Sequence, residues 1–468
     1  REGNFRGVKR LQKFLFKSLE ARCLAVHRVT EVNSGRFTPG VDDRLCNTDA
    51  EKVTLVEELR SKNYKPEPCR LCLIPKKGGD NRKLGIPTIL DRAMQTLVLL
   101  AMEPEWEARF EPHSYGFRPG RGPIDVINDI GTYFLPKSGR KNHPGWVLDA
   151  DISKCFDNIN HDALLKKIGD SPFLFMIKAW LKAGTISKVG FKTSNRGSPQ
   201  GGVISPLLAN IALDGLERLF SIYTRNGIYK CPSIRSGMDK FVLVYRYADD
   251  FLIFALSRNI IIEHIIPRVK EFLAGIGLEL NEAKTRVTNI SDGFNFLGFH
   301  FRRFHRKDGS VSKFIYHPQR ERIDRFLREL KLQLRVSYSI PVQDMIRSLN
   351  RRIRGFCNYF RWSNAHEMFS YLDHGLFESL YSWARHKHYK RGKKWLRKRY
   401  WRSTRRLQWQ FSFEGIDLLT ASHLKVQWWK WPKLRIHSSP HDRAAFDYWH
   451  RKRKDRIQRA GRTGGAGN

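Results

Sequence analysis

The sequence has few cysteines, no long apolar run and a shortage of acidic residues. Its seven Cys are scattered over 468 residues, so the disulfide framework of a small secreted protein is not expected. The longest apolar runs, such as Phe251–Leu256, are too short to cross a bilayer, and no signal peptide opens the chain. We therefore expect an intracellular protein without a membrane span. The first residue is Arg1 and not methionine, as in a fragment of a longer protein.

The charge of the chain is strongly one-sided. There are 85 Lys and Arg against 46 Asp and Glu, which gives a net charge of +39 at pH 7. Such an excess favours a polyanionic partner, either nucleic acid or an acidic membrane surface. Aromatic residues at 12% and hydrophobic residues at 41% exclude wholesale disorder. The composition therefore predicts a folded protein that binds a polyanion.

The positive charge is concentrated toward the end of the sequence. Residues 381–468 contain 24 Lys and Arg against 5 Asp and Glu, and they hold eight of the twelve Trp. Basic side chains interleaved with aromatic ones suit phosphate contacts combined with base stacking. The alternative is a helical domain with a Trp core and a solvated basic face. The run Lys390–Arg406, with ten basic residues in seventeen and no acid, favours a phosphate-bearing partner.

Hydrophobic periodicity divides the chain into two parts. Short apolar runs alternate with helical patterns in the first part, which is typical of a mixed α and β domain. From Pro318 onward the apolar residues keep helical spacing, so three successive helices are expected, the second starting near Pro341 and the third capped by Ser363. The other expected elements are amphipathic helix within 1–65 (Val8, Leu11, Leu15 and Leu19 on one face), a helix over Ala50–Arg60, a strand over Leu71–Pro75, a helix over Asp91–Glu103, a strand over Trp146–Ile152, a helix over Val203–Phe220 and a hairpin of Phe241–Tyr245 with Phe251–Ala255.

Two acidic strand ends are the first candidates for chemistry. Asp249 and Asp250 lie at the tip of the expected hairpin, and Asp149 and Asp151 end the strand about a hundred residues earlier. Adjacent carboxylates beside apolar strands are costly unless a cation compensates them. Brought together, the two strand ends would hold Mg²⁺ ions for phosphoryl or nucleotidyl transfer. Taken alone, an Asp-Asp pair at a turn is usually a solvated turn.

The surrounding motifs make the sequence recognisable. The segment Tyr247–Asp250 (YADD) resembles the YxDD box of reverse transcriptases, and Val147–Asp157 (VLDADISKCFD) is similar to their first acidic palm motif. Further motifs follow the family order between about residues 35 and 300. They are Thr38–Asp43 (TPGVDD), Arg82–Thr88 (RKLGIPT), His113–Gly120 (HSYGFRPG), Arg196–Gly202 (RGSPQGG) with Ser205-Pro206, Asn281–Thr285 (NEAKT) and Phe296–Phe299 (FLGF). The motifs TPGVDD, RKLGIPT and HSYGFRPG resemble those in the fingers region of group II intron reverse transcriptases. Asn358–Tyr371 (NYFRWSNAHEMFSY) resembles the maturase, or X, domain of the same proteins.

This resemblance implies an α+β right-hand polymerase. Residues 1–302 would form the fingers and a palm with an antiparallel sheet, including an N-terminal extension over about 1–65. Residues 303–398 would form the α-helical thumb, or X domain. Residues 399–468 would form a basic DNA-binding domain and tail.

The resemblance also implies a two-metal polymerase site. Two Mg²⁺ ions would be held by the catalytic residues Asp151, Asp249 and Asp250 together with the backbone carbonyl of Ile152, while Asp149 would be a neighbour of the site. Arg82 and Lys83 would bind the incoming triphosphate, although Lys83 equally suits an ordinary surface charge. Further roles are implied for Gln200 on the nucleotide sugar, Lys284 as general acid toward pyrophosphate, Phe156 as a steric block against a 2′-OH, and Phe296, Leu297 and Gly298 as the primer grip. Three of these residues also have a plainer interpretation: Gln200 as a polar residue at a helix start, Lys284 as a solvated Lys and Phe156 as a core Phe.

Nucleic-acid contacts are expected from twelve basic residues, which are Arg118, Arg121, Lys390, Arg391, Lys393, Lys394, Arg397, Lys398, Arg399, Arg402, Arg405 and Arg406. The partners implied are group II intron RNA, exon or target DNA, a primer–template duplex and dNTPs. The implied function is RNA-directed DNA synthesis together with splicing assistance and target-primed intron mobility. It would take place in a bacterial cytoplasm, at the nucleoid when DNA is the target, or alternatively in an organelle.

Two other functions remain open. One is an RNA-binding maturase that keeps the polymerase fold only as a scaffold, and the other is a retron or diversity-generating reverse transcriptase. Intact carboxylates count against the first, and the long helical thumb with its basic C-terminal region against the second. No Cys follows Cys357, so we expect no HNH-type endonuclease and no cleavage of the second DNA strand. Cys69 and Cys72 have zinc-knuckle spacing but no partner pair, and we expect them to pack beside a strand.

Overall fold

The computed structural model describes residues 4–61, 63–75, 81–135, 144–187, 190–198, 200–223, 229–232, 242–307, 309–404, 409–427 and 431–461. These residues form two compact units, one of residues 1–122, 146–287 and 435–449 and the other of residues 123–145, 288–434 and 450–468. Among the described helices, none is both long and apolar enough to span a membrane.

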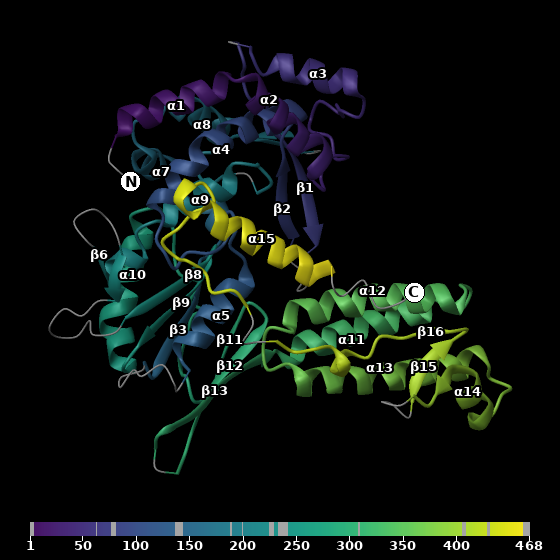
Figure 1. Ribbon diagram of the computed structural model, residues 1–468. Helices are drawn as coiled ribbons and strands as arrows, with labels where there is room; N and C mark the ends of the chain where they lie inside the picture. Colours follow the sequence, from purple (N-terminus) through teal and green to yellow (C-terminus); the bar gives the residue numbers. More distant parts are fainter. Residues whose placement is uncertain are drawn as a thin grey trace. The chain divides into compact units, whose positions relative to one another are not determined.

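The first unit contains two four-stranded β-sheets and the two-stranded pair of β6 and β7, together with covering helices (Figure 1). One sheet has the strand order β2-β1-β4-β5 and the other the order β10-β3-β9-β8. The helices of the unit are α1 Phe5–Lys17, α2 Leu19–His27, α3 Asp49–Glu58, α4 Ile89–Arg109, α6 Cys155–Asn158, α7 His161–Ile168, α8 Leu174–Lys182, α9 Ser205–Leu213 and α10 Ile266–Ala274, with π-helical turns at Arg28–Val32 and Ile260–Ile265 and a 3-10 turn at Glu217–Leu219. Its strands are β1 Cys69–Pro75, β2 Asn81–Ile86, β3 Trp146–Asp151, β4 Thr185–Ser187, β5 Gly190–Lys192, β6 Ser221–Tyr223, β7 Tyr229–Pro232, β8 Leu243–Tyr247, β9 Asp250–Ala255 and the start of β10 Arg286–Asn289.

Two expectations about this unit are wrong. The apolar face expected to run from Val8 to Leu19 is divided, because α1 ends at Lys17 and Leu19 begins α2; Leu11 is 67% exposed. The single helix expected over Val203–Phe220 ends at Leu213. The chain turns at Gly215, whose φ of 111° lies in a region that side chains avoid. The hydrophobic run thus continues past the point where the backbone leaves the helix.

The second unit combines a three-stranded antiparallel sheet with a bundle of three long helices (Figure 1). The apolar stripe of α11 is buried as expected, and Phe326 stacks on Phe356 of α12 with centroids 4.2 Å apart. Ser363 does not cap α13, because its hydroxyl bonds to the carbonyl of Phe360 and the helix begins after Ala365. The elements are α5 Pro123–Tyr133, β11 Phe294–Phe296, β12 Phe299–His305, β13 Val311–Pro318, α11 Arg320–Arg335, α12 Val342–Phe360 and α13 His366–Lys387.

A small basic subdomain follows the bundle. It consists of α14 Lys393–Tyr400 and a three-stranded sheet of β14 Trp401–Arg402, β15 Gln410–Phe413 and β16 Ile416–Asp417. Trp383 and Trp401 are buried here, whereas Trp395 and Trp409 remain more than one third exposed. The Trp residues of this region are therefore divided between core and surface. Trp428 and Trp429 lie outside the described residues. Short 3-10 turns follow at Ala421–His423 and Arg443–Ala445, and the last helix is α15 Phe446–Gly461.

Candidate active site

The predicted acidic residues meet at one end of the sheet of β3, β9 and β8. Strands β3 and β9 are antiparallel, and their register places Asp151 directly opposite Asp250. Residues opposite each other in an antiparallel pair project on the same face with Cβ atoms about 5 Å apart. Asp249 lies in the two-residue turn between Tyr247 and Asp250. The expected hairpin and the approach of its tip to the earlier acidic strand are therefore confirmed.

Burial and mutual repulsion disfavour the ionised form of these carboxyl groups. Burial first, and then the charges of Asp249 and Asp151, raise the pKa of Asp250 to about 6, although its side chain still reaches solvent. Burial and the Asp250 charge raise the pKa of Asp149 to about 7. Burial also raises the pKa of Asp249, against the opposing charges of Arg82 and Lys284. Several carboxyl groups at one sheet end thus lack enough positive charge to compensate them.

The hairpin tip is held from behind by buried polar residues outside the motifs and by Gly116 of the HSYGFRPG motif. Ala248 has a φ of 59°, which costs a non-glycine residue energy. The guanidinium of Arg246, buried beneath the hairpin, donates to the Ala248 carbonyl at 3.2 Å and to Oδ1 of Asn210 at 3.0 Å. A Cβ on Gly116 would lie 2.3 Å from the Ala248 nitrogen, so this contact admits only glycine. Sequence reasoning missed Arg246 and Asn210, since buried polar residues leave no pattern.

Lys284 contacts Asp151 at the acidic end of the sheet. Its ammonium group donates to Oδ2 of Asp151 at 2.5 Å, and this hydrogen bond raises the pKa of Lys284. The neighbouring backbone is fixed as well, since the Asn281 amide donates to the Asp151 carbonyl at 2.9 Å. Ile152 follows in an isolated bridge with Leu280. The ammonium of Lys284 therefore supplies positive charge at Asp151.

The chemistry of these residues suits a hard divalent cation. Carboxylate and carbonyl oxygens are the ligands that Mg²⁺ prefers, and it commonly uses one or two carboxylates completed by substrate phosphates and water. Among the described residues, no three His, Cys, Asp or Glu side chains are arranged to hold a metal ion. The donor set fits Mg²⁺, while the described geometry contains two facing carboxylates and not a complete cage.

Arg82 and Gln200 are brought into direct contact. The Nε of Arg82 donates to Oε1 of Gln200 at 2.9 Å, and the backbone carbonyl of Gln200 accepts from the Gly85 amide at 2.7 Å. Lys83 is the next residue on strand β2, so its side chain leaves the opposite face of the sheet. Arg82 and Gln200 are thus in contact, whereas Lys83 lies on the other face of the sheet.

Phe156 lies in the short helix α6, just after the acidic strand β3. It is half-buried, and its ring meets that of Phe117 edge to face with centroids 6.1 Å apart. The backbone of α6 is held by the Ser198 amide, which donates to the Phe156 carbonyl at 2.7 Å. Phe117 belongs to the HSYGFRPG motif but was not predicted as a site residue. The motif itself could have indicated Phe117, because Phe117 directly follows Gly116, the glycine that packs against the hairpin tip.

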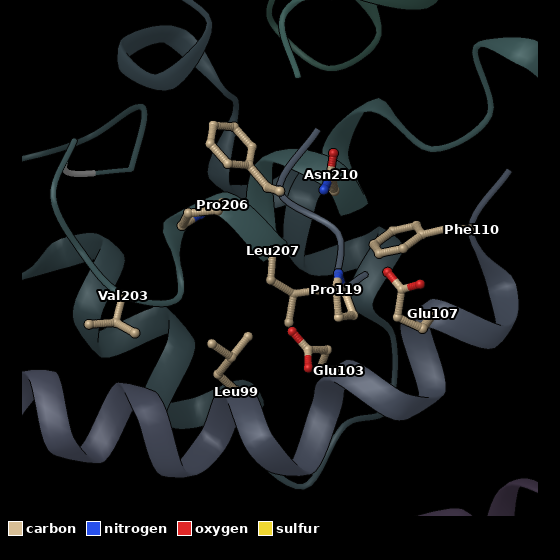
Figure 2. A pocket seen from close by; sticks show the side chains of 10 residues that line it. Leu99, Glu103, Glu107, Phe110, Pro119, Val203, Pro206, Leu207 and Asn210 are labelled. Atoms are coloured by element: carbon tan, nitrogen blue, oxygen red, sulfur yellow. The ribbon is translucent and has the colours of Figure 1, made fainter. Parts of the chain in front are cut away.

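A cavity of about 230 Å³ lies beside these residues in the first unit. Its wall is formed by α4, by α9 and by Phe110, Phe117 and Pro119 of the segment that follows α4, as Figure 2 shows. Leu99, Leu207 and Pro206 make it largely apolar, and Glu103, Glu107 and Asn210 add polar atoms.

The residues expected to form the primer grip lie in a tight turn of the second unit. Leu297 and Gly298 both have positive φ, 49° and 87°, and they connect strands β11 and β12. Phe296 is buried and pairs with Phe299. The hydroxyl of Tyr359 donates to the Leu297 carbonyl at 3.1 Å. The turn is therefore anchored to the helical bundle within its own unit.

The structure contradicts the expectation that Arg118 and Arg121 bind nucleic acid. The Arg118 guanidinium is buried and bonds to both carboxylate oxygens of Glu107 at 2.9 Å. Arg121 is also buried and donates to the backbone carbonyls of Pro112 and Ser114. A guanidinium enclosed by its own chain cannot reach a phosphate. These two residues hold the loop that contains Phe117.

The predicted basic residues of the C-terminal region are on the surface. Exposed side chains in and around α14 are Lys390, Arg391, Lys393, Lys394, Arg397, Lys398, Arg399 and Arg402. Arg397 lies over the ring of Trp409 at 4.1 Å, and Arg391 over that of Trp395 at 5.3 Å. Arg402 pairs with Asp417. Arg405 and Arg406 lie outside the described residues.

Comparisons with known families agree with this arrangement. Residues 74–301 match the family described as reverse transcriptase (RNA-dependent DNA polymerase). Residues 1–59 match the N-terminal domain of reverse transcriptase, and residues 323–401 match the group II intron maturase-specific domain. The polymerase, maturase and RNA-binding character of the chain follows from these matches.

Individual proteins are similar over most of the chain. Protein YkfC of Escherichia coli is 34% identical over 66% of this chain and 88% of its own length. The group II intron-encoded protein LtrA of Lactococcus lactis is 28% identical over 73% of this chain and 68% of its own length. Among solved structures, a telomerase of Candida tropicalis truncated from its C-terminal domain matches at 17% identity and a TM-score of 0.36, covering 53% of this chain and 55% of that one. The matches to the two bacterial proteins and the three domains together place the chain among the group II intron-encoded reverse transcriptases with a maturase domain.

Proposed function

We propose that this protein copies its own intron RNA into DNA at the site formed by Asp151, Asp249 and Asp250, and that it binds the same RNA to assist splicing. The observation that carries the proposal is the register of β3 against β9, which sets Asp151 opposite Asp250 beside the hairpin turn that contains Asp249. Carboxylates gathered at one sheet end can hold the two metal ions that stabilise an in-line nucleotidyl transfer.

Two Mg²⁺ ions bound at these carboxylates and at the Ile152 carbonyl would activate the primer 3′-OH and neutralise the triphosphate. Arg82, held by Gln200, binds the triphosphate oxygens, and Gln200 faces the sugar. Phe156 excludes a 2′-OH from the sugar position. Lys284, which contacts Asp151 here, would donate a proton from its ammonium group to the leaving pyrophosphate.

The remaining parts of the chain handle the nucleic acid. The Leu297–Gly298 turn positions the primer end, and the exposed basic residues of α14 contact the phosphates of intron RNA or target DNA. The Arg397–Trp409 and Arg391–Trp395 pairs offer flat cationic surfaces for unpaired bases. Intron mobility by target-primed synthesis combines these contacts with polymerisation.

A pair of assays on one variant tests this proposal. Asp249→Asn keeps the shape of the turn and removes its charge. Primer extension on an RNA template with Mg²⁺ and dNTPs should fall by at least about 10³-fold, while protein-assisted splicing of the cognate intron should remain within about twofold of wild type. Loss of splicing in a variant that still melts like the wild type would show that the two activities share this site. Wild-type protein that splices but never extends a primer would support a maturase without polymerase function.

A further inference from the structure

Phe117 is an exposed aromatic residue held in an unfavourable backbone conformation beside the active site. Its φ is 61°, and 51% of its surface is exposed. Such a position costs a bulky residue backbone strain and leaves about half of its apolar surface exposed. Strained residues of this kind persist where neighbouring contacts enforce them, and they are concentrated at functional sites.

The residues on both sides of Phe117 are fixed by contacts with the catalytic region. The Gly116 carbonyl accepts from Nδ2 of Asn210 at 2.9 Å, and the Gly116 Cα packs against the backbone of Ala248. Arg118 donates to the Glu111 and Ser114 carbonyls at 2.7 and 2.9 Å, in addition to its pair with Glu107. These contacts hold the backbone at Phe117 close to the hairpin that bears Asp249.

The Phe117 ring makes its aromatic contact with Phe156. The centroids lie 6.1 Å apart and the planes are inclined by 77°, which is the edge-to-face geometry that aromatic pairs prefer. Phe156 is only half-buried, so this neighbour limits where its ring can lie. Phe117 also lines the cavity of about 230 Å³ between α4 and α9. Removing its ring would therefore enlarge an existing hollow and leave the main core packed.

We propose that Phe117 is a positioning residue for nucleotide selection: its ring supports the ring of Phe156, so that Phe156 forms a fixed wall against a ribose 2′-OH. This inference rests on the proposed polymerase function and on the assigned role of Phe156. A wall that can move admits the larger sugar more readily, whereas a deoxynucleotide needs no such displacement. Loss of Phe117 therefore acts mainly on ribonucleotides.

The test compares kcat/KM for a dNTP and for the matching rNTP in single-nucleotide primer extension. Phe117→Ala should reduce the preference for the dNTP by about 10-fold, chiefly through a lower KM for the rNTP, with dNTP kinetics within about twofold of wild type. Phe117→Gly removes the same ring and relieves the positive φ, so it should show the same loss with a higher melting temperature than the Ala variant. Phe175→Ala is the matched control, because it removes a ring that is 83% exposed on α8 of the same unit.

Combining Phe117→Ala with Phe156→Val shows whether Phe117 acts by supporting Phe156 or by contacting the nucleotide directly. Phe156→Val alone should reduce the dNTP preference, and adding Phe117→Ala should reduce it no further, since the supported ring is gone. Additive losses would overturn the proposal, as would an equal fall in kcat/KM for both nucleotides, which indicates a contact with base or template. An unchanged preference in both Phe117 variants would overturn it too. If Phe156→Val itself has no effect, or wild type extends no primer, the proposed function fails first.

Discussion

The Nε of Arg82 donates a hydrogen bond of 2.9 Å to Oε1 of Gln200, a residue 118 positions further along the chain. The two side chains come from different motifs, and their contact orients the guanidinium in the absence of a nucleotide. Arg82 also contributes to the electrostatic field at Asp249. The pair therefore links the proposed triphosphate contact to the acidic end of the palm sheet.

Gln200→Met should impair nucleotide binding through Arg82. The substitution keeps the length of the side chain and removes the acceptor, so the guanidinium loses its orientation. We expect kcat/KM for dNTPs to fall about 10-fold, which corresponds to about 1.4 kcal/mol. In a double-mutant cycle, Arg82→Lys and Gln200→Met should be clearly non-additive. Strict additivity in steady-state primer extension would show that the two residues act separately.

Asp149→Asn should change the pH dependence of stability. Because the native pKa of Asp149 is raised from 3.8 to about 7, the folded state binds more protons than the unfolded state between about pH 4 and pH 7. The free energy of unfolding contributed by this group therefore falls as pH rises through that window. The Asn variant should match wild type near pH 4 and gain on it toward pH 8. A gain of 1 kcal/mol would raise Tm by roughly 2–4 °C.

Thermal melts of both proteins at pH 5 and pH 8 without divalent cations measure this difference. Added Mg²⁺ should reduce it, because a nearby cation favours the ionised carboxylates. A Tm difference that is the same at both pH values would show that Asp149 is not perturbed as described.

Lys284→Met should uncouple metal binding from catalysis. Removing the ammonium group frees Asp151 from its competing cation, so half-maximal activity should require several-fold less Mg²⁺. If Lys284 is the general acid, kcat should nevertheless fall, by about 10²-fold. Mg²⁺ titrations of primer-extension rates give both quantities, with Lys284→Arg as the control that keeps the charge. Unchanged values for both would return Lys284 to an ordinary solvated lysine.

Salt dependence should distinguish exposed basic residues from buried ones. Lys393, Lys394 and Lys398 are exposed on α14, and changing all three to Gln should reduce the slope of log K against log salt by up to about 3. Their replacement should alter stability little, as is usual for surface positions. Filter binding to intron RNA at several salt concentrations measures the slope. An unchanged slope would mean that α14 does not contact phosphates.

Arg118→Gln should have the opposite profile. It leaves the buried Glu107 without its partner, so we expect a loss of about 3–5 kcal/mol in the free energy of unfolding. The salt slope of the protein that remains folded should equal that of wild type. A reduced slope would restore Arg118 to the nucleic-acid surface.

The acidic palm was predictable because its information is local. One apolar strand ends at Asp151 and another begins at Asp250, and this pattern indicates both the sheet and the place where charge accumulates. Burial of a charged residue is not encoded in this way. Arg118 is a residue type that often binds phosphate, and only the fold reveals that its guanidinium is buried and paired with Glu107, eleven residues earlier. The same holds for Gly215, where a continuous apolar pattern hides the end of α9.

The first compact unit includes residues 435–449. Gly120 packs against Trp449, and the Arg121 guanidinium donates to the Ile436 carbonyl across 315 positions of sequence. Ribosomes add roughly 5–20 residues per second, so residue 435 emerges about 7–30 s after residue 287. During synthesis the surface around Gly120 and Arg121 therefore stays uncovered until the helical bundle has been made. The time at which the core is completed is thus set by translation, and slow codons within the bundle would lengthen its exposure to proteases and to premature association.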